Sequence, residues 1–160
     1  DKSKFRLEDL IVIDGKANID PAFQGPGIKS SAETEIHTYL YQADPQIGCV
    51  LHTHSPLGTV LSHVFSKEKK ISFSALEILK GLEGNMTHEL SVELPIVDNS
   101  QDMQDIVREM KKFSPTTGFL IAGHGLYAWG KDVATAKRHI ETYEFLFECF
   151  EVMRRNKWQF

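Results

Sequence analysis

Residues 118–155 read GFLIAGHGLYAWGKDVATAKRHIETYEFLFECFEVMRR, and this stretch decides most of the expected fold. The apolar run at 118–122 and the aromatic run at 126–129 are typical of strands, and the glycines that flank His124 place a turn between them. From Asp132, a residue type that commonly caps helix N-termini, apolar side chains recur at helical spacing over several turns. The stretch therefore predicts a strand hairpin followed by a long helix that packs against a sheet.

The rest of the chain alternates between the same two patterns. Ser30-Ser31-Ala32-Glu33 has the form of a capping box with Ser30 as the N-cap, and Ser55-Pro56 opens a second helix. Strands that alternate with helices predict a single α/β domain over residues 1–160, with helices on both sides of the sheet. The further strands are expected at 5–14, 50–54 and 92–97, and the further helices at 30–44, 55–64, 74–82 and 102–112.

Composition and charge exclude several kinds of partner. Hydrophobic residues make up 41% of the chain and charged residues 25%, as in ordinary soluble globular proteins. The net charge is −4 and there is no basic run, so we expect neither a nucleic acid nor an anionic membrane as partner. No apolar stretch reaches the ~20 residues that a membrane span needs. Cys49 and Cys149 have no Cys-x-x-Cys partner, so we expect reduced thiols and a cytoplasmic location.

Three histidines form the most informative chemical pattern. His52 and His54 are one residue apart on an expected strand, so their side chains point to the same side of it. His124 lies between two glycines, which let the backbone approach a shared centre closely. Three neutral imidazoles with an open fourth position describe a catalytic zinc site. Because a His-x-His pair also arises by chance, hydrogen-bonded core histidines are the alternative at this point.

Taken together, these motifs resemble the class II aldolase and adducin family. The resemblance implies a three-layer α/β/α fold with a mixed, mostly antiparallel central sheet, a zinc ion and a homotetramer with active sites near subunit interfaces. The family usually carries an upstream helix and a Gly-Asn loop that contributes to phosphate binding, so we expect the natural protein to continue N-terminal to Asp1. The motifs are Ser30-Ser31-x-Glu33, His52-x-His54-Ser55 and Gly-His124-Gly followed by a long terminal helix, and the implied zinc ligands are His52, His54 and His124.

Within the family, residues 76–84, 94–99 and 124–149 are most similar to the dehydratases of methionine salvage. This similarity implies a zinc-dependent hydro-lyase that converts 5-methylthioribulose 1-phosphate, a sugar phosphate, into 2,3-diketo-5-methylthiopentyl 1-phosphate and water. Glu77 matches the position of the catalytic acid/base in that branch, whereas without the resemblance it reads as an exposed helix glutamate. Glu33 matches the catalytic glutamate of the aldolases, and we assign it to the substrate pocket, although a capping box explains it equally well.

Phosphate recognition is expected just before the first long helix. Lys29, Ser30 and Ser31 combine positive charge, hydroxyl donors and a helix N-terminus, all of which favour an anion. The alternative is an ordinary capped helix. Tyr127 and Trp129 on the hairpin are expected to be core or interface aromatics.

Two other functions remain open from the sequence. One is an aldolase or epimerase that acts on a different ketose phosphate and uses Glu33. The other is a non-enzymatic interaction domain of the adducin type, from which the metal site has been lost. The presence of all three histidines argues against the second alternative.

Overall fold

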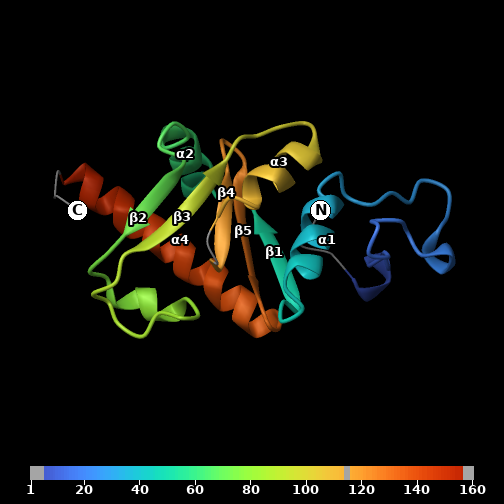
Figure 1. Ribbon diagram of the computed structural model, residues 1–160, viewed down its shortest axis with the longest axis horizontal. Helices are drawn as coiled ribbons and strands as arrows, with labels where there is room; N and C mark the ends of the chain where they lie inside the picture. The colour runs from blue at the N-terminus through green and yellow to red at the C-terminus, as the bar shows by residue number, and fades with distance from the viewer. Residues whose placement is uncertain (1–5, 114–115, 157–160) are drawn as a thin grey trace.

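The computed structural model describes residues 6–113 and 116–156 (Figure 1). Five strands form one sheet in the order β1-β5-β4-β3-β2. The pair β3–β4 is parallel and the other three neighbouring pairs are antiparallel. The expected mixed, mostly antiparallel sheet is therefore confirmed. The strands are β1 (Cys49–Thr53), β2 (Lys70–Phe73), β3 (Val92–Val97), β4 (Gly118–Ile121) and β5 (Gly125–Gly130).

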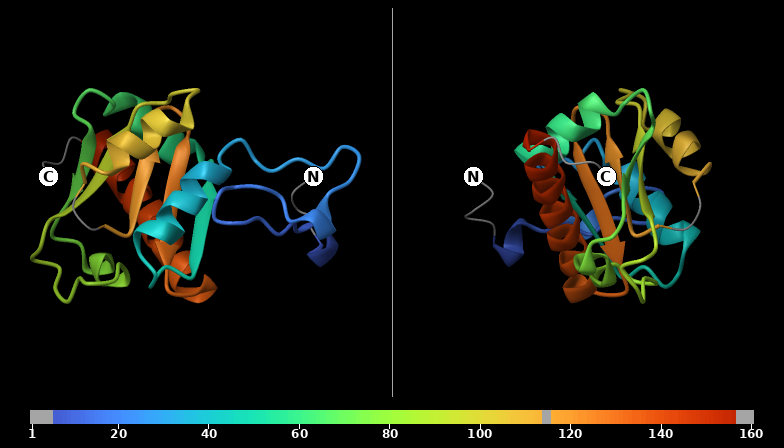
Figure 2. Two further views of the ribbon diagram at one scale, coloured as in Figure 1. Left: turned by 45° about the vertical axis from the view of Figure 1, so that its right-hand side comes forward. Right: turned by 90° about the vertical axis from the view of Figure 1, so that its left-hand side faces the viewer.

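Helices cover both faces of this sheet, which confirms the three-layer α/β/α fold. In Figure 2, α2 and α4 lie on one face and α1 and α3 on the other. None of the helices in the described part of the chain is long and apolar enough to cross a membrane. The longer helices are α1 (Thr34–Ala43), α2 (Pro56–Val64), α3 (Met103–Met110) and α4 (Val133–Arg155), and the short 3₁₀ turns are η2 (Leu7–Asp9), η3 (Pro21–Phe23) and η4 (Glu77–Gly81).

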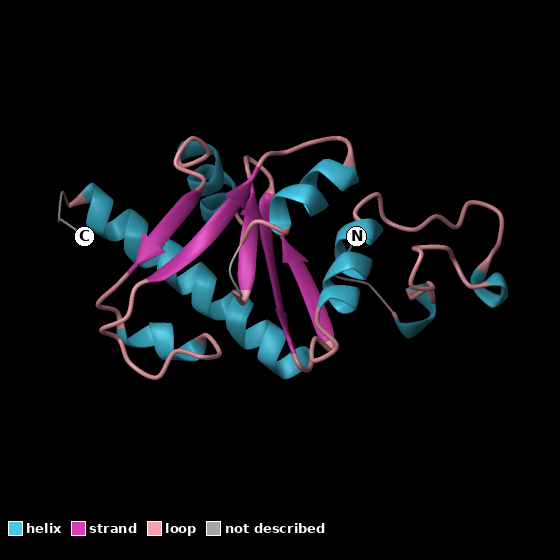
Figure 3. Ribbon diagram, in the orientation of Figure 1, coloured by secondary structure: helices cyan, strands magenta, loops and turns pink. Residues whose placement is uncertain are grey.

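Alternation along the central strands produces two hydrophobic cores. Phe119 and Ile121 of β4 point toward α1 and α3, whereas Leu120 between them points toward α2 and α4. Tyr127 and Leu126 of β5 divide between the two faces in the same way. Because successive side chains of a strand point to opposite faces, β4 and β5 supply apolar groups to both layers of helices. Figure 3 shows this central position of the strands between the helices.

The two N-terminal expectations differ from the structure. Residues 5–14 were expected as a strand, but the described part of this segment contains η2 and a single bridge between Ile13 and Ile19. The segment runs away from the five-stranded sheet, as Figure 1 shows, and Leu7 is 81% exposed. Its apolar residues therefore have no sheet edge to pair with. Phe5 itself lies outside the described residues.

The capping box predicted at Ser30 is also wrong. The helix α1 begins at Thr34, and Glu33 is its N-cap residue without a side-chain capping bond. The Ser31 hydroxyl accepts a hydrogen bond from the Glu33 amide instead, at 3.2 Å. The Glu33 carboxylate is thereby available for the site described below. By contrast, Ser55 and Asp132 cap α2 and α4 as expected.

The core position of Phe147 generates a stability prediction. Phe147 is fully buried between α4, α2 and the sheet, with its ring centroid 6.2 Å from that of Phe73. Replacing Phe147 with Ala should lower the free energy of unfolding by about 3–5 kcal/mol, because it removes buried apolar surface and leaves a cavity. Equilibrium unfolding in urea measures the change. Val152→Ala on the exposed side of α4 is the matched control and should change stability by less than about 0.5 kcal/mol.

Candidate metal centre

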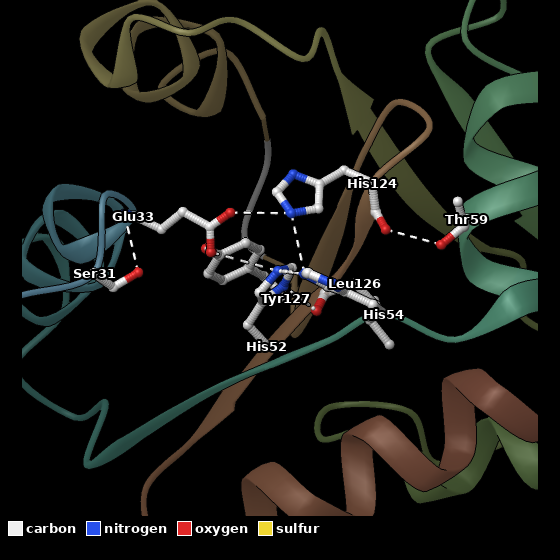
Figure 4. A network of polar contacts seen from close by, with 8 residues as sticks. All are labelled: Ser31, Glu33, His52, His54, Thr59, His124, Leu126 and Tyr127. Carbon is white, nitrogen blue, oxygen red and sulfur yellow. Dashed lines mark hydrogen bonds and ion pairs between the residues drawn. The ribbon is translucent and has the colours of Figure 1, made fainter. Parts of the chain in front are cut away.

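Four side chains converge where β1 ends and the β4–β5 turn begins (Figure 4). They are the imidazoles of His52, His54 and His124 and the carboxylate of Glu33, and their ligand atoms all lie within 4.8 Å of one another. The Nε2 atom of His54 is 2.6 Å from that of His52 and 3.0 Å from that of His124. The structure thus brings together segments that are 70 residues apart in the sequence.

The end of β1 and the residue after it present two histidines to one side. Val50 packs in the core beneath α1 and α3, and His52, two residues later, points to the same face. His52 lies opposite Tyr127 of β5 in the antiparallel register, and the two rings stack at 4.1 Å. His54 follows directly after the strand, and Ser55 is the N-cap of α2.

The β4–β5 turn presents His124 from the other side. Gly123 has a φ of +65°, a conformation that glycine adopts readily. The helix α2 holds the turn, because the Thr59 hydroxyl donates to the His124 carbonyl at 2.8 Å. A Cβ at Gly125 would lie 2.2 Å from the Thr53 carbonyl oxygen, as well as 3.0 Å from the ring of His54 and 3.1 Å from that of His52. Only glycine therefore allows the hairpin to approach β1 this closely.

Glu33 reaches the cluster from the residue before α1. Its Oε1 is 3.0 Å from His124 Nε2, and its Oε2 is 3.5 Å from His52 Nε2. The Tyr127 hydroxyl donates a hydrogen bond to Oε2 at 2.9 Å. Since Tyr127 is buried in the core, this bond fixes the carboxylate relative to the sheet.

Local contacts determine which nitrogen of His52 is free to bind a ligand. His52 Nδ1 lies 2.9 Å from the Leu126 carbonyl, which can only accept, so Nδ1 carries the proton and Nε2 keeps its lone pair. Burial lowers the pKa of His52 to about 4, against the opposing effects of that hydrogen bond and of Glu33. The imidazole is therefore neutral at pH 7. Burial also raises the pKa of Tyr127, so that its hydroxyl remains a donor.

This donor set fits a divalent metal ion. Three imidazole nitrogens and one carboxylate oxygen are ligand types that zinc takes, and three protein nitrogens leave room for a further ligand. A ring N–H donated to a backbone carbonyl, as in His52, is a common support for metal-binding histidines. The side chains of His52, Glu33 and His124 are 12%, 20% and 24% exposed, so a ligand can reach the cluster from solvent.

Glu77, the predicted base, lies at the other end of the sheet. The cluster lies at the end of the sheet where β3 finishes, since β4 runs parallel to β3 and ends at the turn that carries His124. The strand β2 leads away from this end, because its last residue, Phe73, pairs with Val92 at the start of β3. Glu77 opens η4 shortly after β2 (light green in Figure 1). Within one chain the structure does not bring Glu77 to the metal-binding cluster.

The three residues expected to bind phosphate precede α1 in the chain. Ser31 contacts Glu33 through its hydroxyl, and its carbonyl accepts from the Thr34 hydroxyl at 2.7 Å. Lys29 is exposed and Ser30 is partly buried. Because α1 begins only at Thr34, Ser30 and Ser31 lie ahead of the free amides of its first turn rather than at its N-cap.

Tyr127 is the site residue whose role the sequence did not reveal. It is a core aromatic, as expected, but it also stacks on His52 and holds Glu33. Its place depends on the β1–β5 register, which follows from tertiary pairing. The alternation of Leu126, Tyr127 and Ala128 was the one available signal that Tyr127 points away from α4.

Removing one imidazole should abolish tight metal binding. In His124→Ala the bound divalent metal should fall from about one ion per chain to a small fraction, because two histidines bind a metal ion less tightly than three. Metal analysis after dialysis against a weak chelator measures the content. His88→Ala is the control, since His88 lies outside the cluster, and should keep its metal ion. An unchanged metal content in His124→Ala would contradict the assigned ligand set.

Known proteins similar to this chain include dehydratases and an aldolase. The chain is 47% identical over 152 residues to a methylthioribulose-1-phosphate dehydratase of Picosynechococcus sp., covering 93% of this chain and 71% of the relative. It is 41% identical over 158 residues to the dehydratase of that name from Stenotrophomonas maltophilia, covering 97% and 72%.

A solved L-fuculose 1-phosphate aldolase shares the fold, with a TM-score of 0.71 and 15% sequence identity. The match covers 96% of this chain and 66% of the aldolase chain, which is slightly less than two thirds. Residues 1–150 match the family described as "Class II Aldolase and Adducin N-terminal domain". The chain belongs to the class II aldolase and adducin family.

Proposed function

We propose that this chain is a metal-dependent hydro-lyase that converts 5-methylthioribulose 1-phosphate into 2,3-diketo-5-methylthiopentyl 1-phosphate and water. The observation that carries the proposal is the 47% identity to a methylthioribulose-1-phosphate dehydratase in a chain whose three histidines converge. We propose zinc as the metal, because three imidazole ligands with a fourth position left open suit it. The free thiols of Cys49 and Cys149 agree with action in a reducing compartment such as the cytoplasm.

The reaction needs a base, an acid and stabilisation of negative charge. The substrate carries a ketone at carbon 2 and hydroxyls at carbons 3 and 4. A base removes the proton from carbon 3, an acid protonates the hydroxyl that leaves carbon 4 as water, and the resulting enol becomes the diketone. A divalent ion bound by the histidines supplies Lewis-acid stabilisation of charge on the substrate oxygens.

Glu77 is the proposed base. A hydrogen bond from Lys80, with Oε1 at 2.6 Å, holds the pKa of the Glu77 carboxyl below its usual range, and His88 lies 3.1 Å from Oε2. The carboxylate is therefore ionised at neutral pH, which is the form that a general base requires. Because Glu77 and the metal-binding cluster lie at opposite ends of the sheet, Glu77 has to act on substrate held by a neighbouring subunit. We accordingly propose a homo-oligomer, and a tetramer by likeness to the family.

Glu33 and the segment before it are the proposed substrate contacts. The Glu33 carboxylate faces the cluster with one oxygen toward His124, where it can accept a substrate hydroxyl. Lys29, Ser30 and Ser31 are proposed to contact the phosphate. The position of Glu33 also favours one second candidate function, an aldolase in which Glu33 takes part in cleavage between carbons 3 and 4. Product analysis separates the two reactions.

Turnover with and without metal tests the proposed function. The zinc-loaded protein should form the diketone from 5-methylthioribulose 1-phosphate without aldol fragments. Chelation by EDTA should lower the rate at least about a hundredfold, because Lewis-acid stabilisation supplies several kcal/mol, and zinc should restore it. Diketone and fragments are followed together by mass spectrometry. Fragments in place of the diketone would move the function to the aldolase, and the absence of both products would refute the substrate.

The Glu77→Gln variant tests whether Glu77 is the base and whether it acts on substrate held by a neighbouring subunit. It should lower kcat by roughly 10²–10⁴-fold, the usual contribution of a general base, while the zinc content stays unchanged. Co-expression of Glu77→Gln with His124→Ala should restore up to about a quarter of the sites, since a mixed oligomer can join an intact cluster to an intact Glu77. Rates of purified mixed oligomers measure this recovery. A mixed oligomer as inactive as its parents would contradict action across subunits.

A further inference from the structure

An apolar pocket lies beside the proposed base. It measures about 590 Å³ and lies between η4 and the outward side of α4. Glu77 lines it together with Lys80 and the backbone of Gly81. The remaining lining residues are apolar, and they are Leu76, Ile78 and Phe145. Phe145 is 50% exposed and Ile78 is 36% exposed.

The walls of this pocket are held in place by the core. Leu79 and Leu82, in and just after η4, are each 1% exposed and anchor the turn beneath α4. Gly81 packs directly on Thr142 of α4, where a side chain would not fit, and Arg138 donates to the Gly81 carbonyl at 3.0 Å. The anchoring leaves the intervening face, with Glu77 and Ile78, directed outward. The pocket is therefore a fixed feature of the folded chain.

The chemistry of the substrate specifies what must lie next to the base. Carbon 5 is bonded to carbon 4, from which the hydroxyl leaves, and it carries the methylthio sulfur. Carbons 1 and 5 are each two bonds from carbon 3, so a base at carbon 3 has the phosphate end on one side and the methylthio end on the other, and an apolar pocket beside the base suits the methylthio end. A thioether is apolar and polarisable, and it makes favourable contacts with aromatic rings. An exposed phenylalanine next to two aliphatic side chains offers such a surface.

We propose that Leu76, Ile78 and Phe145 form the subsite for the methylthio end of the substrate, and that Phe145 is its specificity-determining residue. This inference rests on the proposed function and on Glu77 as the group that reaches the reacting carbons. The subsite and Glu77 belong to the same subunit, so both meet the substrate from the side opposite the metal-binding cluster. A subsite for the methylthio group also explains why large apolar side chains remain exposed beside the Glu77 carboxylate.

Comparison of two substrates tests the subsite. The zinc-loaded protein is assayed with 5-methylthioribulose 1-phosphate and with 5-deoxyribulose 1-phosphate, in which hydrogen replaces the methylthio group. In Phe145→Ala the preference for the methylthio substrate, as the ratio of the two kcat/KM values, should fall about tenfold, the scale at which a pocket distinguishes one small apolar group. The value for the deoxy substrate should change less than about twofold.

Two variants complete the experiment. Phe145→Leu keeps an apolar side chain and should retain most of the preference, whereas Val152→Ala, exposed on the same helix outside the pocket, should leave it unchanged. An equal loss with both substrates in Phe145→Ala, or an unchanged ratio, would overturn the subsite while leaving the function intact. If the unaltered protein converts neither substrate, the proposed function fails and the subsite fails with it.

Discussion

The antiparallel pairing of β1 with β5 is the contact on which the rest of the site depends. It sets His52 opposite Tyr127, and the stacked rings then place the Tyr127 hydroxyl against Glu33. A shift of one residue in this register would turn His52 toward α4 and separate it from the carboxylate. The same pairing carries the β4–β5 turn over the end of β1, where His124 meets His54. Core packing and ligand geometry are thus consequences of one strand pair.

The sequence predicted those elements whose local signals agree with their surroundings. The strands β4 and β5 and the helix α4 follow from apolar periodicity and from Asp132, and the structure has them within one or two residues of the expected bounds. The N-terminal strand failed because strand-like residues form a strand only where a partner edge is within reach. The Ser30 capping box failed because tertiary contacts keep the Glu33 side chain at the cluster instead of at its own helix end.

The same distinction applies to the site. The histidine pattern was visible because strand alternation alone aligns His52 with His54, and the flanking glycines mark His124. Tyr127 was not visible as a support for Glu33, because its partner depends on how two distant strands align. The separation of Glu77 from the cluster likewise follows from strand directions that no local pattern encodes. Its catalytic role, the phosphate contacts and the single domain over residues 1–160 stay predictions.

The close approach of Gly125 to β1 has a consequence for how this protein can vary. The tip of a hairpin is usually the part of a sheet that best accepts insertions and foreign loops. Here the β4–β5 tip is held to α2 through Thr59, and a side chain at Gly125 would collide with the Thr53 carbonyl and press on two imidazoles. Sequence diversity among functional descendants should therefore accumulate in the outlying N-terminal segment, while this turn keeps both its length and its glycines.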